Sequence, residues 1–350
     1  MRTRILWVSF LVLILSALGY CSYPGDSNGD RVCDDLDFLE VINNFGKNYL
    51  PINGPGDCYQ DGVVDDLDFL SVTNNFGKDY RYIVPGEMVY IPAGDFLMGN
   101  SGVGDDAVYR SSYPEELPQH WVNLSAYWIG KYEVTRGEYR QFINAGGYSS
   151  SVYWSSAGWN WKVANNRTEP GDWAASAYWV IPPGAFTQSE YYPVIDVNYY
   201  EAEAYCNWAG GHLPTEAQWE KAARWNPTTN HPNVYPWGDV NYRNKCNDWY
   251  DDLYPGHQTS PIGSYPLGVS PYGCQDMAGN VFEWCKDWYS ATYYAASPAS
   301  DPQGPTCGTY GVLRGGAWSD GEDYSRTAHR YTGDLPKNYW TAGGFRLARD

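Results

Sequence analysis

The chain has 350 residues, of which 43% are hydrophobic, so it is long enough for one large core or two domains. Its formal net charge is −18, from 41 acidic and 23 basic residues, and a surface of this sign repels phosphate backbones. Nucleic acid is therefore disfavoured as a partner. The 17 Trp and 33 Tyr residues instead favour a loop-rich domain whose surface carries binding sites.

Residues 1–19 have the pattern of an export signal. Two arginines precede the apolar run Ile5–Leu15, and small residues at cleavage-type spacing end at Gly19. We expect cleavage after Gly19, a secreted, cell-surface or periplasmic location, and no membrane span after cleavage. A retained membrane anchor and lipidation of Cys21 are the alternatives.

Export would permit disulfide bonds among the eight cysteines. Their pairing cannot be deduced from the sequence. Cys33 with Cys58 and Cys246 with Cys274 are the pairs that we favour. The absence of a Cys-x-x-Cys pair argues against a metal site built on sulfur.

Residues 20–82 contain a duplicated segment. "GDSNGDRVCDDLDFLEVINNFGK" starts at Gly25, and "GDCYQDGVVDDLDFLSVTNNFGK" starts at Gly56. Each copy opens with oxygen-bearing residues at alternating loop positions, as calcium requires, and continues with apolar residues at helical spacing. The candidate calcium ligands are Asp26, Asn28, Asp30, Asp34 and Asp37 in the first copy and Asp57, Asp61, Asp65 and Asp68 in the second.

The duplicated segment resembles the paired calcium loops of dockerins. The resemblance implies a small α-helical EF-hand-type pair, and a cohesin-like or other extracellular protein as its partner. Tyr59 replaces one expected ligand in the second loop, and Arg31 replaces the usual glycine in the first. A calcium-stabilised spacer without a partner and a solvated acidic turn are the alternatives.

A linker at 83–86 leads to one large domain at 87–350. Its clearest predicted helices are Tyr199–Gly210 and Thr215–Trp225. Thr215 is placed to cap the second helix, and Gln218 completes a capping box. Elsewhere, short strand-like runs alternate with turn residues.

Several stretches of this domain, in order, resemble the formylglycine-generating enzyme or sulfatase-modifying factor family. The resemblance implies an α+β, elaborated C-type-lectin-like fold with small sheets, few helices and much irregular structure, stabilised by buried aromatic residues and calcium. The stretches are "MVYIPAGDFLMGN" (Met88–Asn100), "GHLPTEAQWEKAAR" (Gly211–Arg224), "YGCQDMAGNVFEWCKDWY" (Tyr272–Tyr289), "LRGGAW" (Leu313–Trp318) and "GGFRLARD" (Gly343–Asp350).

The same resemblance implies Ca²⁺ as a cofactor. The family's calcium ligands fall on the side chains of Asp276 and Glu283 and on the backbone carbonyls of Gly279 and Val281, a donor set that suits a hard cation. The alternative for the two acids is helix capping and surface charge. A second site would begin at the side chain of Asn247 and the carbonyl of Asp248. Its remaining ligands would lie near Asp251 or Asp252, in a segment to Pro261 that does not align cleanly.

The enzymes of this family bind copper(I) through two cysteines and use oxygen to convert a substrate cysteine into formylglycine. In this chain the two positions hold Asp320 and Ser325, and Val312–Asp350 contains no cysteine. Carboxylate and hydroxyl oxygens are hard ligands, whereas copper(I) selects soft thiolates. We therefore expect neither copper binding nor formylglycine generation.

Other branches of the superfamily offer two further interpretations. One makes sulfur–carbon bonds with non-haem iron held by a His-rich motif, and the five histidines here show no such spacing. Another uses the fold as a binding module that displays variable residues in the C-terminal segment. The candidate ligand-binding residues of that segment are Trp318, Ser319, Asp320, Tyr324, Ser325 and His329.

Two further groups of residues have a structural alternative to ligand binding. The Trp-rich stretch Gly146–Trp179 is expected to form a loop-like insertion, which would either stack on sugars or fill satellite cores. Trp318 and Tyr324 would belong to the core under the same alternative.

Four arginines are expected to be structural and to bond carbonyls and carboxylates in an irregular interior: Arg314, Arg326, Arg330 and Arg346.

The leading prediction is an exported, calcium-stabilised binding protein whose ligand is a glycan, a peptide or a cell-surface partner. The sequence leaves two alternatives open. One is an enzyme with a different, non-copper chemistry that uses Asp320, His329 or a hard metal ion. The other is a structural subunit of an extracellular assembly, recruited through the calcium loops.

Overall fold

The computed structural model describes residues 86–171, 190–240, 244–250, 258–333, 335–338 and 341–350. The chain divides into two units, 1–82 and 83–350, and every described residue belongs to the second. The expected signal, the duplicated calcium loops and the Cys33–Cys58 pair lie outside the described residues.

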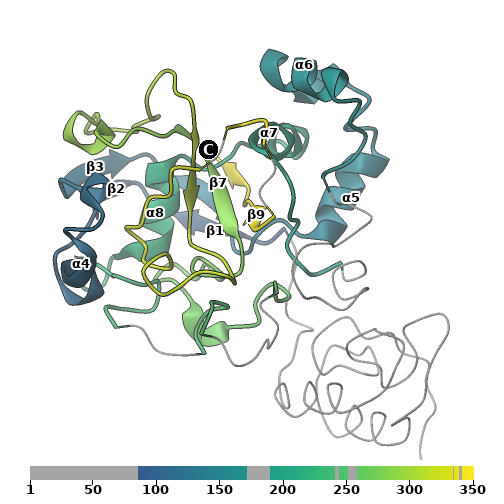
Figure 1. Cartoon of the computed structure of the whole chain (residues 1–350). Helices are drawn as coiled ribbons and strands as arrows, with labels where there is room; N and C mark the ends of the chain where they lie inside the picture. Colours follow the sequence, from purple (N-terminus) through teal and green to yellow (C-terminus); the bar gives the residue numbers. More distant parts are fainter. Residues whose placement is uncertain (1–85, 172–189, 241–243, 251–257, 334, 339–340) are drawn as a thin grey trace, which may run out of the picture. The chain divides into compact units, whose positions relative to one another are not determined.

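One sheet joins the beginning of the described domain to its end (Figure 1). Strand β4 (Tyr127–Gly130) lies between β1 (Met88–Ile91) and β10 (Ala348–Arg349) and is antiparallel to both. A separate antiparallel pair consists of β2 (Gly94–Met98) and β3 (His120–Leu124). In β3 buried and more exposed residues alternate, as expected for a strand with one face on the core.

A second three-stranded sheet brings together three of the stretches that carry the family resemblance. Strand β7 (Phe282–Trp288) is antiparallel to β8 (Gly311–Arg314) and parallel to β9 (Gly343–Gly344). All four residues of β8 and six of the seven in β7 are buried or partly buried. A two-residue pair, β5 (Trp225–Asn226) with β6 (His231–Pro232), completes the sheets of the described residues.

Both predicted helices are confirmed. They are α7 (Tyr199–Trp208) and α8 (Glu216–Arg224), and Thr215 with Gln218 forms the predicted capping box of α8. The other helices within the described ranges are α4 (Gly104–Tyr109), α5 (Arg136–Asn144) and α6 (Ser156–Ala164), with short 3₁₀ turns η2 (Pro114–Glu116), η3 (Ser151–Tyr153), η4 (Pro266–Gly268) and η5 (Tyr293–Ala295).

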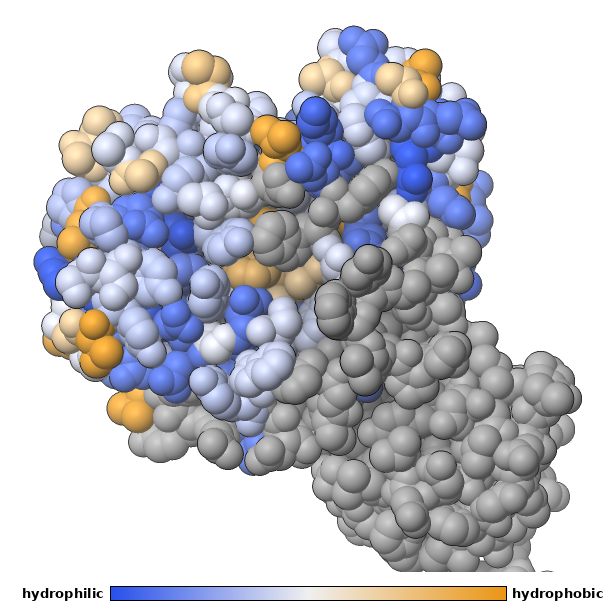
Figure 2. All heavy atoms as spheres, viewed as in Figure 1, coloured by the Kyte–Doolittle hydropathy of each residue, from blue (hydrophilic) through white to orange (hydrophobic). Residues whose placement is uncertain are grey.

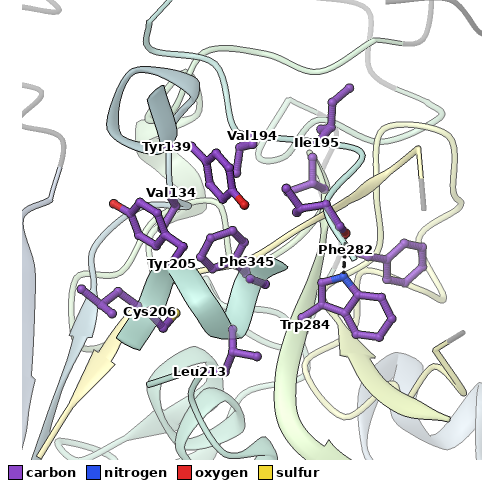
Figure 3. Packing of buried hydrophobic residues seen from close by; sticks show 14 of the residues in the cluster. Val134, Tyr139, Val194, Ile195, Tyr205, Cys206, Leu213, Phe282, Trp284 and Phe345 are labelled. Atoms are coloured by element: carbon purple, nitrogen blue, oxygen red, sulfur yellow. Dashed lines mark hydrogen bonds between the residues drawn. The ribbon is translucent and has the colours of Figure 1, made fainter. Parts of the chain in front are cut away.

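The larger buried cluster is rich in aromatic side chains (Figure 3). Tyr139 of α5 stacks on Tyr205 of α7 with ring centroids 5.4 Å apart, and Phe345 meets both rings at steep angles. Trp284 of β7 donates a 3.0 Å hydrogen bond to the carbonyl of Val197. Because these residues come from distant parts of the chain, the cluster ties α5 and α7 to the β7 sheet.

A second buried cluster packs α8 against β2 and β3. Its centre is Trp219, which is fully buried together with Phe96 and Val122.

The visible outer surface carries mainly hydrophilic residues, with hydrophobic residues in small separate groups (Figure 2). No helix among the described residues is long and apolar enough to cross a membrane.

The Trp-rich stretch is more ordered than a loop within its described part, 146–171, since it contains η3 and α6. Trp154 is buried, and its indole donates to the carbonyl of Gly147. Trp159 and Trp161 pack partly against the larger cluster. The described part therefore fits the core-filling alternative better than the loop-like insertion that we expected.

One disulfide prediction is wrong. Neither Cys246 nor Cys274 forms a disulfide, and both are buried in the interior. Cys206 and Cys285 are also free and buried, whereas Cys307 is free and exposed. The aromatic clusters, rather than disulfides, hold the described domain together.

Candidate functional site

A network of ion pairs lies in the interior around α8. Arg330 bonds Glu216 through two nitrogens at 2.7 and 2.8 Å, and the side chains of both residues are almost fully buried. Arg314 pairs with Glu220 and also donates to the carbonyl of Thr327. Two-point guanidinium–carboxylate contacts of this kind fix orientation as well as charge.

The network extends to the N-terminal part of the domain. Arg326 reaches Glu116 at 2.7 Å and Asp106 at 2.9 Å. Arg224 pairs with Glu220 at 2.9 Å and with Asp106 at 3.2 Å. The network therefore contains four carboxylates and four guanidinium groups, all at most 1% exposed, and its formal charges balance: Asp106, Glu116, Glu216 and Glu220 with Arg224, Arg314, Arg326 and Arg330.

This arrangement confirms the structural role predicted for the arginines. Arg346 is bound in the same way, with two 2.6 Å contacts to the carboxylate of Glu283 and one of 2.9 Å to the carbonyl of Gly130. None of these five buried arginines is free to hold a ligand without breaking such contacts, because each guanidinium already serves several acceptors.

A second group of buried charges surrounds Arg346 and is not balanced. Glu283 and Asp276, the predicted calcium side chains, are buried, which rules out the surface-charge alternative. Glu283 also accepts a 2.8 Å hydrogen bond from the indole of Trp219, and Asp276 accepts one of 2.7 Å from the backbone of Gly263.

A third acid, Glu133, belongs to this group although the sequence did not single it out. Its side chain accepts from Asn280 Nδ2 at 2.7 Å and from the backbone N–H of Val281 at 3.3 Å. Burial, reinforced by the charges of Asp276 and Glu283, raises the pKa of Glu133 well above its usual range. Burial likewise raises the pKa of Asp276 to about 6.

Three carboxylates and one guanidinium leave a formal charge of −2, which a divalent cation would neutralise. Among the described residues, no three His, Cys, Asp or Glu side chains are arranged to hold a metal ion. A calcium ion would therefore rely on the side chains of Asp276 and Glu283 together with the carbonyls of Gly279 and Val281, as the resemblance implies. Both oxygens of Glu283 already accept from Arg346, so calcium would have to compete with this ion pair, and the site stays a prediction.

The second predicted calcium site starts next to the first. Asn247 donates to the carbonyl of Gln258 at 2.8 Å and to Asn280 Oδ1 at 3.1 Å, and its own carbonyl accepts from the backbone of Asn280. Asp248 accepts from the backbone N–H of Tyr250 at 2.9 Å. Residues 251–257, where the remaining ligands would lie, are outside the described residues.

The candidate ligand-binding residues differ in how far they are exposed to solvent. Trp318 is only 8% exposed and belongs to the larger aromatic cluster, and Ser325 and His329 are 1% and 2% exposed. Ser319 is exposed, whereas Asp320 and Tyr324 are partly exposed. A ligand arriving from solvent therefore meets Ser319, Asp320 and Tyr324 first.

Two aromatic residues that the sequence did not single out adjoin Asp320. The backbone N–H of Trp249 donates to the carbonyl of Asp320 at 2.9 Å, and Tyr250 lies against Gly321, where an added Cβ would be 3.7 Å from its ring. The side chains of Trp249 and Tyr250 are 50% and 49% exposed. Partial burial raises the pKa of the Asp320 carboxyl to about 6, and the charge of Asp323 adds to this effect.

The domain matches the model of the sulfatase-modifying factor enzyme 1-like domain over residues 74–350. The chain belongs to this family. The formylglycine-generating enzyme of Thermomonospora curvata is 36% identical to it over 297 residues, which cover 75% of this chain and 93% of that enzyme. The family membership and the family fold predicted from the sequence motifs are thus confirmed.

Similar proteins carry the names of different activities. The hercynine oxygenase of Mycolicibacterium thermoresistibile is 38% identical over 249 residues, covering 67% of this chain and 53% of that enzyme. This chain thus spans about half the length of that relative. Among solved structures, PvdO from Pseudomonas aeruginosa superimposes with a TM-score of 0.57 at 25% identity, covering 76% of this chain and 94% of PvdO.

Proposed function

We propose that this member of the sulfatase-modifying factor family is an exported binding module rather than a formylglycine-generating enzyme. The observation that carries the proposal is the pair of oxygen side chains, Asp320 and Ser325, at the positions where the resemblance places two copper-binding cysteines. Ser325 is buried and Asp320 adjoins half-exposed aromatic rings, so this part of the fold offers a surface for contact in place of a thiolate pair.

The ligand would be a peptide or a glycan presented outside the cell. Trp249 and Tyr250 provide ring faces, and Ser319 and Asp320 provide hydrogen-bonding groups beside them. Rigid aromatic rings combined with small polar groups are typical of surfaces that recognise polar macromolecules. The dockerin-like loops at 20–82 would recruit an extracellular protein, and calcium would stabilise both parts of the chain.

A second candidate function is an enzyme with a different chemistry. It is favoured by the relatives, which include a hercynine oxygenase and a formylglycine-generating enzyme. Asp320, whose pKa is about 6, would serve as its acid–base group. Turnover that depends on a metal other than copper and is lost in Asp320→Ala would favour this candidate.

A combined peptide and glycan array, probed with the full chain, tests the binding proposal. Trp249→Ala should abolish specific binding. Trp121→Ala is the matched control, since Trp121 is similarly exposed at 53% but lies on β3. Formylglycine formation on cysteine peptides supplied with copper, or an array without specific binding, would contradict the proposal.

A further inference from the structure

The surface around Asp320 combines carboxylates with aromatic rings. Asp323 accepts a 2.6 Å hydrogen bond from the hydroxyl of Tyr113, and Asp320 lies three residues away at the end of the preceding turn. Tyr109 makes a similar but longer contact with Glu322, at 3.4 Å. We define the acidic aromatic surface as six residues: Asp320, Asp323, Tyr113, Tyr324, Trp249 and Tyr250.

Within the described part of the chain, no positive charge compensates Asp320. Arg326 lies beneath this surface, with its guanidinium 5.2 Å from the ring centroid of Tyr113. That guanidinium already pairs with Glu116 and Asp106. The groups that act on the ionisation of Asp320 are Ser319, the backbone of Ala317 and the like charge of Asp323, with no cation among them. Counting the described residues alone, the acidic aromatic surface therefore has an excess of negative charge.

Beneath the same surface lies a hydrogen-bond acceptor that the described residues leave without a donor. His329 is 2% exposed and its ring meets the rings of Tyr113 and Tyr324, at centroid distances of 4.7 and 4.8 Å. Its Nδ1 is 3.4 Å from Glu116 Oε1, and neither ring nitrogen has a hydrogen-bond partner among these residues. The same holds for Ser325 Oγ, which is also buried.

The protonation states leave His329 with one acceptor nitrogen beneath this surface. Although burial opposes ionisation, hydrogen bonds from His329 and Arg326 hold the pKa of Glu116 at about 2. Burial lowers the pKa of His329, so its imidazole is neutral near pH 7. The single ring proton then lies on Nδ1, facing the Glu116 carboxylate, and Nε2 presents a lone pair.

We propose that the acidic aromatic surface binds a lysine or arginine side chain of a partner peptide. Aromatic faces attract a cation and also cover the methylene groups of its side chain. The cationic head would pair with Asp320, beside the half-exposed rings of Trp249 and Tyr250. The net charge of −18 favours the approach of a basic segment from a distance. This inference rests on the proposed binding function and names its ligand class.

Calorimetric titration of the full chain with a pentalysine peptide, at about pH 7.5 where Asp320 is ionised, tests the inference. Penta(acetyl-lysine) is the matched peptide, since it has the same length without the charge. Pentalysine should bind at least about ten-fold more tightly, and its affinity should fall as salt increases.

Variants locate the site. Asp320→Asn should weaken pentalysine binding about ten-fold. Asp95→Asn removes the same charge from an exposed position on β2 and should leave the affinity unchanged. If Asp320→Asn lost the near-ultraviolet circular dichroism of the buried aromatic residues, Trp249→Ala would replace it as the variant expected to weaken binding.

Equal affinity for the charged and the acetylated peptide, or an unchanged affinity in Asp320→Asn, would overturn the inference. Binding of neutral glycans alone, lost in Trp249→Ala, would overturn it as well while supporting the proposed binding function. Absence of binding to every peptide and glycan would overturn both.

Discussion

Two buried groups of charges differ in their balance. Around α8, four carboxylates meet four guanidinium groups, and each charge has a partner inside the protein. Around Arg346, three carboxylates share one guanidinium. The balanced network is complete without any bound group, whereas the unbalanced cluster must hold protons or attract a cation. The balance of charges thus separates structural ion pairs from positions where an ion or a ligand would bind.

Breaking the balanced network should have the largest effect on stability. Arg330→Met removes both contacts to Glu216 and leaves a buried carboxylate without its main partner. We expect a loss of about 3–5 kcal/mol in the free energy of unfolding, measured by urea denaturation. Arg140→Met, which removes a partly exposed arginine paired with Glu190, is the control and should cost less than about 1 kcal/mol. A similar loss in both variants would refute the distinction.

The unbalanced cluster should respond to calcium. We expect calcium at about a hundred times its dissociation constant to stabilise the domain by about 2.7 kcal/mol relative to chelator, measured from the unfolding of its buried tryptophans. Glu133→Gln removes one of the three carboxyl groups that a bound cation would keep ionised, and should reduce this gain. If calcium left the stability of the domain unchanged, the charge-balance interpretation of this cluster would be wrong.

We expect the pH dependence of stability to come mainly from buried acids outside these two groups of charges. Glu201 is fully buried, and burial raises its pKa to about 8 although it accepts a 2.8 Å hydrogen bond from Tyr148. A raised pKa stabilises the fold fully below the unfolded value of about 4.5, and the contribution is lost as pH rises through about 8.

Stability should therefore fall by at least about 1 kcal/mol between about pH 5 and pH 8, measured by denaturation in chelator. Glu201→Gln keeps the shape of the side chain without its ionisation, so the slope should flatten. An unchanged slope in this variant would assign the pH dependence to other groups, such as Asp287, whose pKa burial raises to about 7.

The smallest effect on stability is expected at the surface. Asp320 forms no ion pair with a cation among the described residues, so Asp320→Asn should change the free energy of unfolding by no more than about 0.5 kcal/mol. Thermal denaturation at neutral pH measures this. A loss of several kcal/mol would place Asp320 among the structural charges.

Local patterns were predictable from the sequence because the interactions behind them are local. The capping box joins Thr215 and Gln218, only three positions apart, and the family motifs place β7, β8 and β9 in order. The structural role of the arginines was also predictable, since Arg314 and Arg346 lie inside family motifs between apolar residues and glycine.

The partners of those arginines were not predictable. Arg326 and Glu116 are separated by 210 residues, and no local spacing relates them. Glu133 was missed for the same reason, since its contacts come from Asn280 and Val281. Trp318 was among the candidate ligand residues, but its neighbours in the fold place it in the aromatic cluster.

The separation of structural from binding charges is tested most directly by one experiment on two variants. Stability in urea and affinity for pentalysine are measured in parallel on Arg330→Met and Asp320→Asn. We predict that Arg330→Met loses about 3–5 kcal/mol of stability and keeps its affinity where folded, while Asp320→Asn loses about ten-fold in affinity and keeps its stability. A fall in stability without a fall in affinity in Asp320→Asn would contradict this separation.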